Sequence, residues 1–220
     1  MKKSMYSLML NDEIINEIDK LAEDQGTNRS NLINKILADY TNLTTPEQRI
    51  NSIYESIESF FDKLSNFESL LEPNDSTLSI KAPLTYKYKP TVKYDIQIYK
   101  SFFDNTIGEL KIMFRTQYKP LLDTIFSFFE IFTSIEKKYL ETYFPDQYYG
   151  YKFDNTKFTR FFMSNSNSIN NEDYLAALIA SYVKSIDIML NKYINEKYKN
   201  EYCLEKDYVK LFLSNNKILI

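Results

Sequence analysis

The sequence predicts an α+β protein, mostly helical, with a small N-terminal domain at residues 1–43, a connecting amphipathic helix at 44–72 and a C-terminal domain at 77–220. Three patterns support this prediction. Residues 6–10 alternate apolar and polar side chains ahead of two short helical patterns, residues 78–98 keep a period of two, and most other segments carry apolar residues at helical spacing. We therefore expect the C-terminal domain to combine a small antiparallel sheet with helices that cover it.

The first predicted element is a strand at residues 6–10. A strand this short is not stable alone, because its backbone groups need a partner. We therefore expect two copies of the chain to pair these strands into one ribbon, an element that fits the major groove of DNA. The strand side chains expected in the dimer core are Tyr6, Leu8 and Leu10. The outward side chains are Met5, Ser7 and Met9.

Two helices are predicted after the strand. The first begins at Asn11, a good N-cap, carries acidic residues in its first turn, and ends at Gly26, where a left-handed conformation is usual. The second begins at the cap residue Asn28. Both show an apolar stripe at spacings of three and four residues. Helix side chains expected in the dimer core are Ile18, Leu32 and Ile36.

The stretches 6–14 and 26–33 resemble the ribbon-helix-helix family of small repressors from bacteria, plasmids and phages. The resemblance covers residues 3–42 and does not extend to residues 44–220. It implies a dimeric DNA-binding protein whose outward strand residues contact base edges in the major groove. It also implies phosphate contacts from the amides that begin the second helix and from nearby basic side chains. The residues implied for phosphate contacts are Lys2, Lys3, Asn28, Arg29 and Ser30.

The outward strand departs from the family pattern, which usually has Arg, Lys, Thr, Gln or Asn there. Met5 and Met9 cannot make the bidentate hydrogen bonds that distinguish guanine or adenine, but they can contact thymine methyl groups. An AT-rich operator would suit them. The alternative interpretation is that the outward strand packs on something else and that this domain serves only for dimerisation.

The charge of the N-terminal segment is unevenly placed. Residues 1–42 carry seven acidic and five basic side chains, and most of the acids lie on the first predicted helix, which the family holds away from DNA. Lys2, Lys3 and Arg29 lie near the proposed DNA face. This pattern predicts few phosphate contacts and a modest salt dependence of binding.

The composition excludes several classes of function. The chain has no histidine, which removes histidine-based acid–base catalysis and most transition-metal sites. Three scattered glycines cannot form a phosphate-binding loop or a dinucleotide fingerprint. The single cysteine, Cys203, excludes an internal disulfide framework, and we expect no signal peptide, because the sequence turns straight into the amphipathic strand pattern. We expect a cytoplasmic protein that is not an enzyme and has no cofactor or metal.

A helix is predicted from Thr45-Pro46 onward, with apolar residues at alternating spacings of three and four as far as Leu71. This three-heptad seam is typical of a coiled coil that would extend the dimer. The alternative is a helix that packs on the C-terminal domain, since Phe60 and Phe61 widen its apolar face. We favour the second interpretation, because phenylalanines at these positions crowd a two-stranded seam.

The C-terminal domain begins with a strand pattern. Every even position of residues 78–98 is apolar or proline, and residues 110–114 repeat the pattern. With a turn at 89–91, this predicts a three-stranded antiparallel meander with one polar face. That face is either a second basic surface for DNA or an acidic partner, or a face whose lysines keep the sheet soluble. Its basic residues are Lys81, Lys87, Lys89, Lys93, Lys111 and Arg115.

Helices are expected to cover the apolar face of this meander. Residues 120–143 are apolar around most of the helix and should be central, but the run is too short to span a bilayer, so we expect no membrane association. Residues 171–198 form a long amphipathic pattern. Residues 209–220 are expected to dock as a last helix or to serve as a partner-binding tail.

These patterns predict a sequence-specific transcriptional repressor that binds double-stranded DNA as a homodimer or higher homo-oligomer, with a C-terminal domain that controls assembly or response. The abundance of Lys, Asn, Ile and Tyr suggests an AT-rich genome, such as that of a plasmid or phage of low-GC bacteria. The alternative is an antitoxin or plasmid-maintenance protein whose C-terminal domain binds a protein partner. A weaker third hypothesis is a DNA-bridging protein that uses both basic surfaces.

Overall fold

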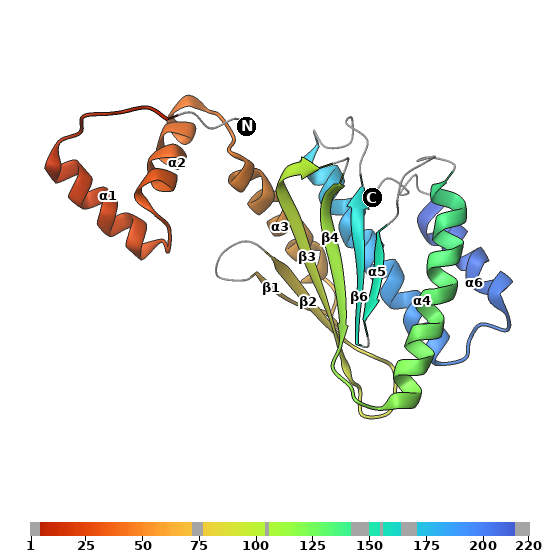
Figure 1. Cartoon of the computed structure of the whole chain (residues 1–220). Coiled ribbons are helices and arrows are strands. Elements are labelled where there is room, and N and C mark those ends of the chain that lie inside the picture. Colours follow the sequence, from red (N-terminus) through yellow and green to blue (C-terminus); the bar gives the residue numbers. More distant parts are fainter. Residues whose placement is uncertain are drawn as a thin grey trace. The chain divides into compact units, whose positions relative to one another are not determined.

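The computed structural model describes residues 5–71, 77–103, 106–141, 150–154, 156–163 and 171–213 (Figure 1). The chain forms two compact units, Met1–Asn51 and Ser52–Ile220. The fold is α+β, as predicted, and helices contain more of the described residues than strands do. The boundary between the units lies inside the predicted connecting helix and not at its start.

The first unit contains α1 (Asp12–Asp24), α2 (Arg29–Thr41) and the first part of α3 (Pro46–Phe61). The side chain of Asn11 accepts a hydrogen bond from the Glu13 amide at 3.2 Å, and that of Asn28 accepts one from the Asn31 amide at 3.0 Å. Gly26 follows α1 with a φ of +61°, a conformation that glycine adopts without strain. The predicted caps are confirmed.

Residues 5–11 form neither a helix nor a strand in the single chain. The ribbon predicted for residues 6–10 needs a second chain to supply its hydrogen-bond partners. It therefore stays a prediction.

The third helix is shorter than predicted. A reciprocal pair of side-chain to backbone bonds between Thr45 and Gln48, at 2.8 and 3.1 Å, fixes its start. It ends at Phe61, because the chain turns back there and the Phe67 ring packs against the Phe61 ring at a centroid distance of 4.9 Å. The predicted continuous helix to Leu71 is wrong, since Leu71 lies in a strand.

From Ser52 onward α3 belongs to the second unit and is largely buried. Ile53, Tyr54 and Ile57 are at most 2% exposed, and the Tyr54 hydroxyl accepts a hydrogen bond from the Ile98 amide at 2.9 Å. This agrees with the favoured interpretation, a helix packed on the C-terminal domain. The same burial leaves these side chains unavailable for a coiled-coil seam.

The described part of the second unit contains a six-stranded antiparallel sheet in the order β1-β2-β3-β4-β6-β5. The predicted meander is present as its three consecutive strands β2, β3 and β4. The strands are β1 (Glu68–Leu71), β2 (Leu78–Pro83), β3 (Thr91–Phe103), β4 (Thr106–Phe114), β5 (Tyr151–Asp154) and β6 (Lys157–Met163).

Even-numbered residues lie opposite each other in the meander, as predicted. Ile80 pairs with Tyr94, which pairs with Ile112, and all three side chains are fully buried. The predicted turn at 89–91 is wrong, however, because β2 already ends at Pro83. The intervening residues 84–90 form a loop that the Leu84 amide closes by donating to the Pro90 carbonyl at 2.9 Å.

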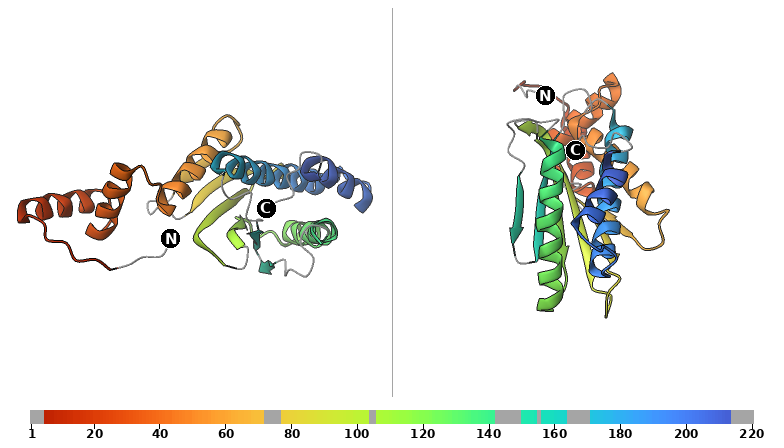
Figure 2. Two further views of the ribbon diagram at one scale, coloured as in Figure 1. Left: turned by 90° about the horizontal axis from the view of Figure 1, so that it is seen from above. Right: turned by 90° about the vertical axis from the view of Figure 1, so that its right-hand side faces the viewer.

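Four helical segments follow the meander, and the helices α4 and α5 pack on its buried face (Figures 1 and 2). The Phe129 ring of α4 stacks on the Phe158 ring of β6 with 4.0 Å between the ring centroids. The Tyr182 ring of α5 lies edge-on to the Phe162 ring of β6, with 6.1 Å between the centroids. The segments are α4 (Lys119–Leu140), α5 (Glu172–Ile194), α6 (Glu201–Tyr208) and the π-helical turn η1 (Val209–Leu213).

The two helices predicted after the meander, at 120–143 and 171–198, are present as α4 and α5, and both end earlier than predicted. Asn171 caps α5 by accepting from the Tyr174 amide at 3.0 Å, and Glu196 ends it with a φ of +54°. Phe212 of η1 is buried, so the start of the predicted docking segment does pack on the unit. The predicted segments at 72–76, 104–105, 164–170 and 214–220 lie outside the described residues.

A buried ion pair joins the sheet to the helices. Arg160 of β6 donates to the Glu136 carboxylate of α4 at 2.8 Å, and both side chains are at most 4% exposed. The hydroxyl of Tyr151 in β5 donates to the same carboxylate at 2.5 Å, and that of Tyr182 in α5 at 2.8 Å. Because a buried charge is stable only when paired and hydrogen-bonded, this cluster links two strands to two helices.

Candidate nucleic-acid interface

The first unit leaves most of its large apolar side chains in solvent. Ala22, Leu32 and Ile50 are its only fully buried apolar residues among those described. The exposed ones are Met5, Tyr6, Leu8, Met9, Leu10, Ile14, Leu21, Ile36, Leu37, Tyr40 and Leu43. A unit of this size cannot build a stable core from three side chains, so its apolar surface needs another surface to cover it.

Most of the side chains predicted for the dimer core belong to this exposed set. Tyr6 is 85% exposed, Leu8 66% and Ile36 46%. Ile18 is half-buried and Leu32 is buried, both within the single chain. In the single chain, therefore, most of the side chains predicted for the dimer core are not buried.

The side chains predicted for base contacts are also in solvent. Met5 is 98% exposed, Met9 is fully exposed, and Ser7 lies between them in the same exposed segment. Since Tyr6 and Leu8 are exposed as well, the two faces of residues 6–10 are equivalent in the single chain. The predicted distinction between a core face and a DNA face depends on the pairing of two strands.

The start of α2 has the features expected of an anion site. Asn28 uses its side chain to cap the Asn31 amide, while the amides of Arg29 and Ser30 lie in the first turn, where a helix offers them no backbone acceptor. Such amides and the positive end of the helix attract a phosphate. The predicted contacts Lys2 and Lys3 lie outside the described residues.

Arg29, predicted to contact phosphate, has a partner within the protein. Its guanidinium forms two hydrogen bonds to the Asp19 carboxylate of α1, one of them at 2.6 Å. This bonding lowers the pKa of Asp19. Both side chains are about half exposed, so a DNA phosphate would have to replace the Asp19 carboxylate at an accessible position.

The second basic surface predicted for the meander is only partly on strands. Lys81, Lys93 and Lys111 lie on the face of β2, β3 and β4 that no described helix covers. Lys87, predicted on a strand, and Lys89, predicted in the turn, both lie in the exposed loop 84–90 because β2 ends early.

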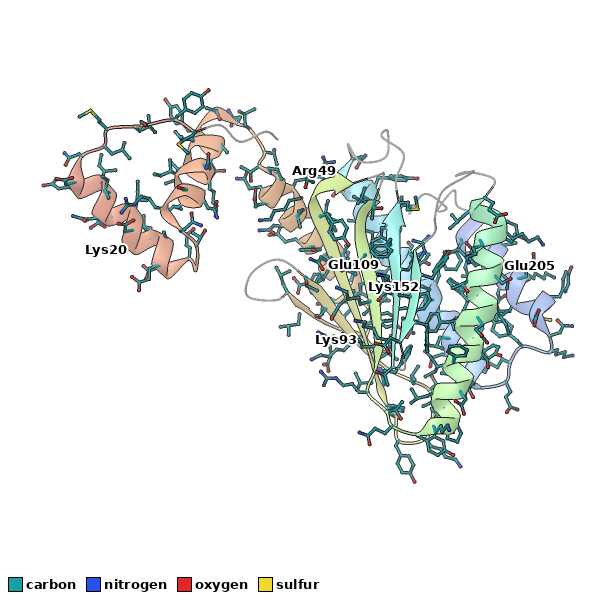
Figure 3. The ribbon with its side chains drawn as sticks, in the orientation of Figure 1. Lys20, Arg49, Lys93, Glu109, Lys152 and Glu205 are labelled. Atoms are coloured by element: carbon teal, nitrogen blue, oxygen red, sulfur yellow. The ribbon has the colours of Figure 1, made fainter. Side chains whose placement is uncertain are left out.

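Two of the sheet lysines form ion pairs with acidic neighbours. Lys93 pairs with Asp95 at 3.0 Å, and Lys111 pairs with Glu109 at 2.5 Å. Figure 3 shows Lys93, Glu109 and Lys152 on three different strands of the sheet. These ion pairs fit the alternative interpretation of the polar face, in which its lysines keep the sheet soluble.

The sequence analysis missed two basic residues of this face, Lys152 of β5 and Lys157 of β6. The apolar alternation of β6 is broken by Arg160, which points to the buried face and is stabilised there by Glu136. Without knowledge of that partner, an arginine at an inward position argues against a strand. The apolar residues Phe158 and Phe162, which lie on one face of an extended chain, were the sequence signal that could have indicated this strand.

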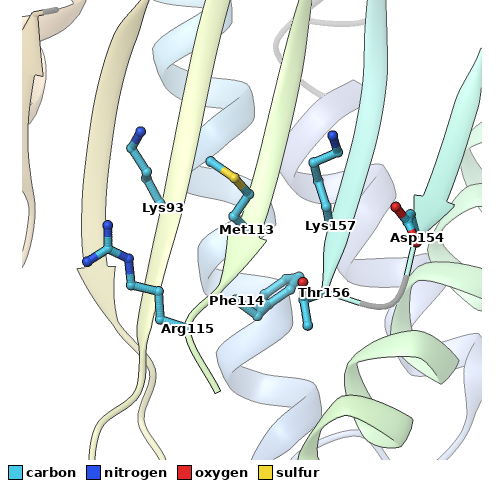
Figure 4. Close-up of a pocket in the computed structure, with 7 residues that line it drawn as sticks. All are labelled: Lys93, Met113, Phe114, Arg115, Asp154, Thr156 and Lys157. Carbon is cyan, nitrogen blue, oxygen red and sulfur yellow. The ribbon is translucent and has the colours of Figure 1, made fainter. Parts of the chain in front are cut away.

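The open face contains a hollow of about 610 Å³ where β3 and β6 begin and β4 ends (Figure 4). Lys93 and Lys157 lie on either side of Met113, because β4 separates their strands. The lining residues are Lys93, Met113, Phe114, Arg115, Asp154, Thr156 and Lys157. Three of the seven are cationic and one is acidic, so the hollow is suited to an anion.

Comparison with known proteins gives no relative: no family model, curated protein or solved structure matches this chain. Within the described ranges, no helix is both long and apolar enough to cross a membrane. The same residues contain no group of three acidic or cysteine side chains arranged to hold a metal ion.

Proposed function

We propose that this chain is a dimeric DNA-binding protein that represses transcription and reads the major groove with an intermolecular two-stranded ribbon. The observation that carries the proposal is the apolar surface of the first unit. Its apolar side chains recur at the spacings of an amphipathic strand and two amphipathic helices, yet most of them lie in solvent.

A second copy of the chain is the partner that best fits this surface. Each leucine or isoleucine that becomes buried stabilises an assembly by about 1.5–3 kcal/mol. Two copies that pair residues 6–10 would satisfy the strand backbone and cover Leu8 and Ile36 in one step. Symmetric dimers are the commonest way in which a chain covers such a patch.

The DNA-binding part of the proposal rests on the resemblance of residues 3–42 to the ribbon-helix-helix family and on local geometry. The caps at Asn11 and Asn28 and the turn at Gly26 give the two helices the bounds that the resemblance requires. Met5, Ser7 and Met9 would then face base edges, and the first amides of α2 would bind a phosphate.

The test is selection of binding sites from a pool of random duplexes with the purified full-length chain. We expect enrichment of an AT-rich site with two-fold symmetry. Ser7→Ala should weaken binding to that site and leave the dimer intact, whereas Ser59→Ala, on the exposed surface of α3, should bind as the original chain does. No enrichment, or equal binding by all three proteins, would count against the proposal.

The second candidate is an antitoxin or plasmid-maintenance adaptor whose C-terminal unit binds a protein. The observation that favours it is the sheet face without a described helix, where Leu70 of the edge strand β1 is 57% exposed. In that case the chain should dimerise but enrich no DNA sequence, and Leu70→Lys should weaken partner binding.

A further inference from the structure

We propose that the hollow on the open sheet face is a phosphate-binding site that contacts the backbone of duplex DNA. This gives the second unit its own, sequence-independent part in DNA binding. The inference rests on the proposed function, because it takes DNA as the polyanion that the chain meets.

The strand register brings the cations together. Lys93 of β3 pairs with Met113 of β4, which pairs with Lys157 of β6. Since neighbouring strands lie about 4.8 Å apart, the two lysines begin roughly 10 Å apart on the same face. The Arg115 amide donates to the Thr91 carbonyl at 3.0 Å, which fixes the arginine beside the start of β3.

Two cations of the hollow, Arg115 and Lys157, form no ion pair among the described residues, although Lys157 lies opposite Asp154 in the register of β5 and β6. In the part of the chain that the structure describes, no carboxylate lies within 4.0 Å of the Arg115 or Lys157 side-chain nitrogens, whereas Lys93 and Lys111 on the same face have acidic partners at 3.0 and 2.5 Å. Asp154 is the one acidic side chain in the lining. The hollow therefore carries a net positive charge, although the whole chain has a formal net charge of −3.

This charge matches a phosphate better than a single carboxylate. A planar guanidinium offers paired donors to phosphate oxygens, the lysines act as point charges, and Thr156 adds a hydroxyl to the lining. All of these groups contact the phosphate and none reads a base, so the site is expected to add affinity without sequence preference.

The cations continue past the hollow, which favours an extended polyanion over a small phosphorylated molecule. Lys81 of β2 lies directly opposite Lys93, and Asp95 is the carboxylate that pairs with Lys93 there. Lys87 and Lys89 lie in the loop that leads into β3 at the same end of the sheet. A DNA backbone supplies phosphates in a row along this path.

The experiment measures binding of the full-length chain to a duplex of arbitrary sequence over a range of potassium chloride concentrations. Each phosphate contact adds about 0.9 to the slope of log affinity against log salt concentration. The double variant Arg115→Gln/Lys157→Gln should therefore reduce the slope by roughly 2 per bound protomer. Asp154→Asn should change affinity in the opposite direction and tighten binding.

The matched control is Lys197→Gln/Lys206→Gln, which removes two exposed lysines after α5 and in α6. It should keep the original slope, and all variants should keep the original melting temperature. An equal slope for the double variant and the control would overturn the inference, while enrichment of a symmetric site would still support the proposed function. A chain that binds no duplex even at low salt would overturn both.

Three further probes test whether the hollow binds another occupant. Inorganic phosphate or ATP that binds with the same dependence on Arg115 and Lys157, in a chain whose DNA slope does not change, would assign the hollow to a small phosphorylated molecule. Polyglutamate that binds in this way would assign it to an acidic protein. Either result would overturn a DNA backbone site.

Discussion

Replacing Glu136 with leucine removes the acceptor at the centre of the buried cluster that joins β5 and β6 to α4 and α5. The Glu136 carboxylate accepts from Arg160, Tyr151 and Tyr182 at 2.5–2.8 Å. In the variant, the Arg160 guanidinium, which is 4% exposed, would lose the Glu136 carboxylate as its counter-ion. The two tyrosine hydroxyls would also lose their acceptor.

The magnitude follows from these losses. Breaking a buried ion pair by removing one partner costs about 3–5 kcal/mol, and each hydroxyl left unpaired in the interior costs about 1–3 kcal/mol. Glu136→Leu should therefore lower the free energy of unfolding by at least about 5 kcal/mol, a large part of the roughly 5–15 kcal/mol typical of a domain.

The assay is urea unfolding of the full-length chain, followed by the fluorescence of its 19 tyrosines, since the chain has no tryptophan. Arg160→Met and the double variant Glu136→Leu/Arg160→Met complete a double-mutant cycle. Because the double variant removes both charges of the buried Glu136–Arg160 pair, it should be more stable than Glu136→Leu, with a coupling of roughly 2–3 kcal/mol.

A matched cycle uses Lys138 and Glu205, which pair at 2.7 Å from the same helix α4, with the lysine 66% exposed. Its coupling should be much smaller, because solvent screens an exposed pair. Additive effects at Glu136 and Arg160, or a loss below about 1 kcal/mol for Glu136→Leu, would refute the assignment of the cluster as a structural link.

Three further predictions concern one buried acid and the first unit. Burial raises the pKa of Asp187 to about 6, above its ordinary 3.8, although Tyr94 donates a hydrogen bond to it at 2.8 Å. Its protonated form is favoured in the folded state, so the contribution of Asp187 to stability should rise as pH falls from 7 to 4, by up to about 3 kcal/mol. The difference in stability between the original chain and Asp187→Asn should show this pH dependence in urea titrations. Ile36→Asp should convert the proposed dimer into single chains in size-exclusion chromatography without a loss of helical circular dichroism. Asp19→Asn should release Arg29 and tighten DNA binding measured by fluorescence anisotropy; weaker binding would contradict a phosphate role for Arg29.

The sequence was sufficient where the signal is local. Asn11, Gly26 and Asn28 set the helix ends of the first unit through contacts within three residues, and each behaves as predicted. The even positions of the meander were predictable for a similar reason, since one buried face imposes a period of two. Ile80 and Tyr94, both at even positions, are fully buried, as this period requires.

The sequence was not sufficient where a distant partner decides. The end of α3 depends on the contact between Phe61 and Phe67 after the chain reverses, and the helical spacing continued through that point. The strand β6 depends on the pairing of Arg160 with Glu136, 24 residues earlier in the chain. The hollow was hidden for the same reason, because Lys157 joins Lys93 only through the register of β6 against β4.

The central claim is that two chains pair residues 6–10 into a ribbon, and hydrogen exchange of these five backbone amides tests it most directly. In the full-length chain they should be protected at concentrations where it is a dimer, and Ile36→Asp should abolish that protection. Exchange at the rate of an unstructured peptide at every concentration, with or without DNA, would contradict the claim.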